Sequence, residues 1–139
     1  MIKTRKQIEY SIKIDEIYFD HNYGFNPDDD TFYDESQIEI TGKVVIGGVS
    51  RIAKVCIKSS DNKLSNSQNI IGYIEGHEQE DESLYIIFNI AMSVSAVDKI
   101  LTMMLSEKNL DLRIFGSDLP SIEGDDTGYV YSIWFQHFD

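Results

Sequence analysis

The sequence predicts a mainly β fold: an antiparallel β-sandwich or a strongly curved sheet of about seven strands with one short α-helix. Three observations support this class. Apolar and polar residues alternate with a period of two along most of the chain, turn residues recur at short intervals, and only one segment has helical spacing. Short strands joined by frequent turns favour an antiparallel sheet over alternating strands and helices. The 139 residues are expected to form a single domain, residues 1–139.

The expected strands follow one another with polar segments between them. They cover residues 8–20, 38–46, 49–58, 69–75, 83–91, 110–114 and 129–135. In the first strand the alternation shifts by one position near Asp15 and Glu16, which predicts a β-bulge. Gly47 and Gly48 separate the second and third strands and indicate a hairpin, because glycine adopts positive φ without a steric cost. The run at 83–91 is apolar on both faces, which is typical of a central strand.

One helix is expected over residues 95–108. Ser95 stands three residues before Asp98, as in a capping box that begins a helix. The apolar stripe at helical spacing consists of Val97, Leu101, Met104 and Leu105. Together with the parity of the strands, this stripe predicts a core. The expected core contains Ile12, Ile40, Val44, Ile86, Phe88, Leu101, Leu112, Ile114 and Ile133.

Acidic residues dominate the charge of the chain. Twenty-four acidic residues against twelve basic ones give a net charge of -12. We therefore expect no direct binding to nucleic acid or to membranes, because both are polyanionic. More than half of the acids lie in three segments without lysine or arginine, residues 20–35, 75–82 and 118–126, all expected to be loops. Such loops can serve solubility alone, or a basic partner can relieve their mutual repulsion.

The most acidic of these segments is also rich in aromatic residues. Tyr18, Phe19, Tyr23, Phe25, Phe32 and Tyr33 lie in or beside it. Aromatic side chains anchor protein interfaces, and acidic neighbours add electrostatic steering. The alternative is a loop that folds back and buries these rings in a core of its own. The candidate partner-binding residues are Tyr23, Phe25, Asp28, Asp29, Asp30, Phe32, Tyr33, Asp34, Glu78, Glu80, Asp81, Glu82, Asp125 and Asp126.

The carboxylates do not match a regular metal site. A calcium loop of the EF-hand type beginning at Asp20 would have Thr31 where the bidentate glutamate belongs. An irregular calcium site at residues 28–34 stays an alternative; it would use Asp28, Asp30 and Asp34. The histidines lack the short spacing of a zinc site; they are His21, His77 and His137. The sequence predicts no metal and no cofactor.

The sequence contains no catalytic signature either. Cys56 lies in an expected strand, where a cysteine is usually a small buried apolar residue, and as the single cysteine it forms no internal disulfide.

The basic N-terminal cluster lacks the apolar stretch of a signal peptide, and no apolar run is long enough to span a bilayer. We expect a cytoplasmic protein. Its abundant isoleucine and scarce alanine fit an AT-rich bacterial gene.

A small, acidic chain with aromatic-rich acidic loops resembles the immunity proteins that neutralise toxins exchanged between bacteria. The resemblance lies in size, charge and loop character rather than in a motif. It implies a basic protein partner, namely a nuclease-type toxin whose active site the acidic surface covers. A nuclease cleft is positively charged because its substrate is a polyanion. A carboxylate-rich protein therefore competes with the nucleic acid for binding to this cleft.

Two kinds of alternative stay open on the sequence alone. One is a nucleic-acid mimic that inhibits a defence protein by arranging its acids in a phosphate-like row. The other is a small β-sandwich enzyme, or a calcium-binding or carbohydrate-binding domain, whose acidic loops converge at one rim.

Overall fold

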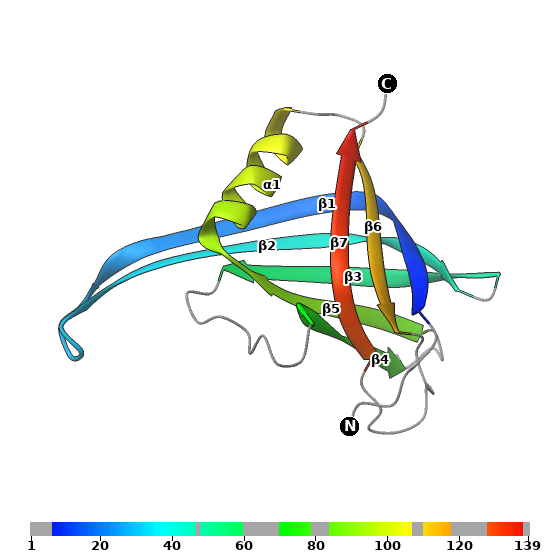
Figure 1. Cartoon of the computed structure of the whole chain (residues 1–139), viewed down its shortest axis with the longest axis horizontal. Coiled ribbons are helices and arrows are strands. Elements are labelled where there is room, and N and C mark those ends of the chain that lie inside the picture. The colour runs from blue at the N-terminus through cyan, green and yellow to red at the C-terminus, as the bar shows by residue number, and fades with distance from the viewer. Residues whose placement is uncertain are drawn as a thin grey trace.

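The computed structural model describes residues 7–46, 48–59, 70–78, 84–106, 110–117 and 128–137. Within these ranges it contains seven strands and one helix (Figure 1). They are β1 (Gln7–Asn26), β2 (Thr31–Ile46), β3 (Val49–Ser59), β4 (Gly72–Glu78), β5 (Leu84–Met92), α1 (Val94–Ser106), β6 (Leu110–Ser117) and β7 (Gly128–His137). The prediction of a mainly β fold with one short helix is confirmed.

The sheet closes into a barrel, so the predicted sandwich or open curved sheet is wrong. The strand order is β1-β2-β3-β5-β4-β7-β6, and β6 pairs back onto β1 from Ser117 opposite Gln7 to Leu112 opposite Ile12. One pair, β3 with β5, is parallel, whereas the other pairs are antiparallel. A barrel and a sandwich both bury one face of each strand, so the alternation of residues is the same in both.

Two local features of the predicted strands are confirmed. The register of β1 against β2 shifts between Ile14 and Glu16, which is the expected bulge. Opposite it, a Cβ atom on Gly42 would collide with the carbonyl oxygen of Lys13, so the close approach of the strands requires glycine there. The β2–β3 hairpin closes with Ile46 opposite Val49, and Gly48 has a φ of 79°. Gly47 lies outside the described residues.

The core fills the inside of the barrel. Seven of the predicted core residues are buried, and the remaining two, Leu101 and Ile133, are partly buried and pack against them. Tyr10 of β1 and Phe88 of β5 meet inside the barrel, with ring centroids 5.3 Å apart in an edge-to-face arrangement. The Tyr10 hydroxyl donates a 2.7 Å hydrogen bond to the carbonyl oxygen of Ser117, so this buried polar group has a partner.

Helix α1 covers one end of the barrel, against β2 and β3 (Figure 1). Its N-cap is Ser93, whose Oγ accepts a 3.2 Å hydrogen bond from the Ala96 amide, so the cap predicted at Ser95 is wrong by two residues. Val97 and Met104 are buried in the core, as the apolar stripe predicted. Leu105 is 70% exposed, so its assignment to that stripe is wrong.

Candidate functional site

Strands β1 and β2 extend past the barrel as a two-stranded ribbon (Figure 1). In the described part of the chain, β3 pairs with β2 only as far as Gln37, and β6 pairs with β1 only as far as Ile12. Residues 21–36 therefore pair only with each other, and we call them the arm. The prediction of a loop at 20–35 is wrong, because only residues 27–30 form a turn.

The turn at the tip of the arm is held by its own polar side chains. The Asp28 amide donates a 3.0 Å hydrogen bond to Oδ1 of Asn26, which is an Asx turn. The Asn26 side chain donates a 3.1 Å bond to Asp29, and Asp30 adopts a φ of 54°. Asparagine and aspartate tolerate such conformations better than most residues. The acidic residues at the tip therefore form the turn as well as carrying its charge.

The pairing of β1 with β2 sorts the side chains beyond the bulge onto two faces. Directly paired residues point to the same side of an antiparallel ribbon. The first side, the aromatic face, carries Ile17, Phe19, His21, Tyr23, Phe25, Phe32, Asp34 and Ser36. The second side, the acidic face, carries Glu16, Tyr18, Asp20, Asn22, Tyr33, Glu35, Gln37 and Glu39.

The aromatic face continues the inside of the barrel into solvent. Ile38 and Ile40 are completely buried, and they pair with Phe19 and Ile17, which are about half exposed. Farther out, Tyr23 is 70% exposed and Phe32 is 72% exposed. Phe32 contacts Phe25 with ring centroids 5.0 Å apart, but the arm does not fold back over these rings. The rings therefore do not form a separate core of the kind that the alternative from the sequence expects.

His21, Asp34 and Ser36 form a polar cluster at the base of the aromatic face. His21 Nε2 lies 3.2 Å from Asp34 Oδ1, and His21 Nδ1 lies 2.7 Å from Ser36 Oγ. The order of groups is that of a Ser-His-Asp triad, but the two histidine nitrogens are exchanged relative to that template. The Ser36 amide donates to Ser59 Oγ at 2.8 Å, and Ser36 is only 6% exposed. This cluster ties the base of the arm to the end of β3.

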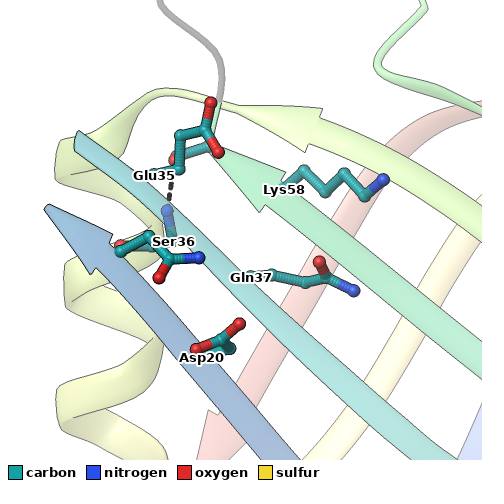
Figure 2. Close-up of a pocket in the computed structure, with 7 residues that line it drawn as sticks. Asp20, Glu35, Ser36, Gln37 and Lys58 are labelled. Atoms are coloured by element: carbon teal, nitrogen blue, oxygen red, sulfur yellow. Dashed lines mark hydrogen bonds between the residues drawn. The ribbon is translucent and has the colours of Figure 1, made fainter. Parts of the chain in front are cut away.

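A polar hollow of about 290 Å³ lies on the acidic face at the base of the arm. Its lining includes Asp20 and Asn22 of β1, Glu35 and Gln37 of β2, and Lys58 and Ser59 of β3. Figure 2 shows that the Lys58 amine points away from the carboxylates of Asp20 and Glu35. No described residue forms a salt bridge with either carboxylate. The hollow therefore has negative charge that Lys58 does not neutralise directly.

Farther along the acidic face, Glu39 is already paired. Lys54 of β3 donates a hydrogen bond to Glu39, and this bond is the main reason that the pKa of Lys54 is raised. Both side chains are partly exposed, so the pair is worth little for stability. The carboxylates available to a partner on this face are therefore Glu16, Asp20 and Glu35, which form no salt bridge with described residues.

Cys56 lies on the outer wall of the barrel rather than in the core. It is half-buried and lines a second hollow, of about 270 Å³, together with Tyr73 and Asn89. Burial raises the pKa of the Cys56 thiol, which keeps it protonated at neutral pH. This protonation state agrees with the expected thiol, and Cys56 is partly rather than fully buried.

The structure brings together only some of the predicted partner-binding residues. Those between 23 and 34 all lie on the arm. Glu78 ends β4, and Glu80, Asp81, Glu82, Asp125 and Asp126 lie outside the described residues. The start of β5 lies level with Ile52 and Lys43, from which the ribbon runs roughly 40 Å to its tip at about 3.3 Å per residue. The described part of the segment 75–82 therefore lies far from the tip of the arm, and the segment 118–126 lies outside the described residues.

Several residues of the site were missed by sequence reasoning. His21, Ser36, Asp20 and Glu35 all take their positions from the β1–β2 register. The available signal was the spacing of Phe19, Tyr23 and Phe25, which share one parity up to the turn residues Asn26 and Pro27, with Phe32 following the turn.

The described residues contain no group of three or more His, Cys, Asp or Glu side chains that could hold a metal ion. This includes Asp28, Asp30 and Asp34, so the irregular calcium site has no geometric support. Among the described helices, none has the length and apolar character needed to cross a bilayer. No protein-family model, curated protein or solved structure matches the chain. The arm is therefore the feature from which a function can be inferred.

Proposed function

We propose that the chain is an acidic protein-binding module that docks onto a basic protein through its arm. More specifically, it acts in the bacterial cytoplasm as an immunity protein, which neutralises a nuclease-type toxin by covering the toxin's active site. The observation that carries the proposal is the arm itself, an aromatic ribbon that projects from a closed barrel (Figure 1).

The exposed rings are the first support. Contiguous exposed apolar surface is rare on monomeric soluble proteins and usually marks an interaction site. The barrel core is complete without the arm, because its buried residues lie inside the closed sheet and under α1. Stability of the barrel therefore does not explain why large aromatic side chains stand exposed at Tyr23 and Phe32. Large aromatic side chains that enter a partner's pockets are typical anchors of protein interfaces.

The charge of the arm is the second support. Its residues 21–36 contain five acidic residues and no lysine or arginine, and the wider stretch 16–41 contains eight acidic residues and again no lysine or arginine. Such a segment attracts a basic surface and repels an acidic one. A ribbon of two strands is about 5 Å wide between strand axes, narrow enough to enter a cleft that admits a nucleic acid. A basic cleft of this kind matches both the shape and the charge of the arm.

The first candidate for the partner is a basic protein encoded beside this gene. The kinetics of its association with this protein then test the proposal. Replacing Asp28, Asp29 and Asp30 with asparagine should slow association about tenfold at low salt and flatten its dependence on salt, because steering acts on the encounter. Dissociation should change much less, because electrostatic steering acts mainly on the rate of association. Stopped-flow mixing at several salt concentrations measures both rates, and nuclease activity in the same samples reports inhibition.

A matched pair of single variants controls for net charge. Asp29→Asn at the tip and Asp98→Asn on α1 each remove one negative charge, and both positions are exposed. Only the first should slow association measurably. Equal effects of the two, or unchanged rates in the triple variant, would contradict docking through the arm. Full nuclease activity of the partner while this protein is bound would contradict inhibition but not docking.

A further inference from the structure

Strand β1 has a long unpaired edge. Residues 13–26, apart from the bulged Asp15, pair with β2 on one side, and within the described part of the chain no strand pairs with them on the other. Along such an edge every second residue directs its backbone N–H and C=O groups outward, where they are available for hydrogen bonds.

This edge lacks most of the devices that normally protect edge strands. Natural proteins block exposed edges with charged side chains, above all lysine, and with proline, bulges or very short strands. The bulge between Ile14 and Glu16 lies where β1 leaves β6. Beyond it, residues 16–26 contain neither lysine nor proline, and their only charges of fixed sign are the acidic Glu16 and Asp20. The edge is therefore an open template for another strand.

We propose that the basic partner adds an extended segment to this edge, in which apolar and basic side chains alternate. The inference rests on the proposed function and specifies how the partner is held. Addition of a strand to an exposed sheet edge is a general mode of peptide recognition, in which backbone hydrogen bonds supply affinity and alternate side chains supply specificity.

The alternation follows from the two faces beside the edge. Side chains of an added strand point alternately to either side of the sheet, and directly opposite pairs lie about 4.5–5.5 Å apart between Cβ atoms. On one side they would contact Phe19 and Tyr23, which are 46% and 70% exposed. On the other side they would face Glu16 and Asp20, for which lysine or arginine is the matching residue.

The hollow on the acidic face provides a place for one of these basic side chains. Asp20 belongs both to the unpaired edge and to the lining of the hollow, and Glu35 lines it from β2 (Figure 2). A cationic side chain placed opposite Asp20 would contact that carboxylate directly, and a long one that extends across β1 into the hollow would approach Glu35 as well. Lys58 does not occupy this position, because its amine points away from them.

A second copy of this chain does not fit the same edge. Pairing of two β1 edges would bring the carboxylates of one copy against those of the other across the new sheet, and like charges on opposite strands destabilise pairing. The occupant is therefore a different, basic chain. Dimerisation of the pure protein that is blocked by Asp20→Lys would contradict this assignment.

The test uses the full chain and a fluorescent synthetic peptide of about ten residues in which valine and lysine alternate, a length that matches Glu16–Asn26. Two further peptides carry N-methyl groups on either the odd-numbered or the even-numbered amides, and a fourth has the same composition in scrambled order. A strand pairs with one neighbour through every second amide, so only one methylated peptide should lose binding, by at least about tenfold. The scrambled peptide should bind at least about tenfold more weakly than the alternating one. Fluorescence anisotropy measures all four.

A charge exchange provides the matched control. Asp20→Lys should weaken binding of the lysine peptide and favour a peptide in which valine and glutamate alternate. Asp98→Lys on α1 makes the same change in net charge away from the edge and should change both affinities less than about twofold. Circular dichroism and thermal unfolding confirm that both variants fold.

In addition to such dimerisation, three outcomes of the peptide measurements would overturn the inference. They are equal binding of the two methylated peptides, equal binding of the scrambled peptide, and no binding of the alternating peptide. The first two would indicate attraction by charge alone. None of the three contradicts the proposed function, which is tested separately by the association kinetics of the aspartate variants with the protein partner.

Discussion

Replacing Tyr23 and Phe32 together with alanine is expected to raise the dissociation constant of the partner complex at least roughly 30-fold, about 2 kcal/mol, mainly through faster dissociation. The physical reason is their position on the aromatic face, where both rings are largely exposed in the free protein. In a complex they would bury more area than any other side chain of the arm, and aromatic anchors carry most of the binding energy of an interface. Surface plasmon resonance with immobilised partner measures both rate constants.

The matched control is Leu105→Ala. Leu105 is 70% exposed, as Tyr23 is, but it lies on α1 rather than on the arm. Its removal should leave binding unchanged. The Tyr23 and Phe32 substitutions should change the free energy of unfolding by no more than about 1 kcal/mol, since the rings contribute little beyond the Phe25–Phe32 contact. A large loss of stability with unchanged binding would show that the rings serve the fold and not an interface.

Replacing Phe88 with alanine is expected to lower the free energy of unfolding by about 3–5 kcal/mol. Phe88 is completely buried and packs edge-on against Tyr10, which belongs to a strand that does not neighbour β5 in the sheet. The contact therefore crosses the inside of the barrel, and its loss leaves a cavity in the centre of the core. The expected loss is a large part of the about 5–15 kcal/mol that stabilises a typical domain. Urea unfolding followed by circular dichroism measures it.

Trp134→Ala is the comparison for this substitution. Trp134 is also aromatic, but it lies on the outside of the barrel, 44% exposed, with the Arg113 guanidinium 5.6 Å from its ring. Its loss should cost about 1 kcal/mol or less. Equal losses for Phe88 and Trp134 would contradict the closed barrel, because in a barrel only the first ring is enclosed.

The composition of the arm was predictable from the sequence, but its conformation was not. Rings and acids occur together in this segment, which predicts partner-binding residues at Tyr23, Phe32 and the aspartates 28–30. The sequence predicts a loop there, because strands are recognised by the contrast between a buried face and a solvated one. Both faces of the arm meet solvent, so that contrast is weak. Only the spacing of the rings and the turn residues Asn26 and Pro27 indicated a hairpin.

The closure of the barrel could not be predicted from the sequence for a different reason. The alternation in β1 and β6 fixes which side of each strand is buried, and this part of the prediction is confirmed by the burial of Ile12 and Leu112. It does not specify the neighbour of each strand. The pairing of β6 with β1, and the parallel pairing of β3 with β5, join segments that are distant in sequence. Such pairings depend on how the whole sheet coils, which single-strand patterns do not report.

Hydrogen–deuterium exchange of the free protein and of its complex with the basic partner tests the central claim most directly. If the arm is the docking element, the amides of residues 21–36 should become strongly protected in the complex, while those of β4 and β7 on the opposite wall should exchange as they do in the free protein. Protection confined to β4 and β7, with unchanged exchange in the arm, would contradict the account.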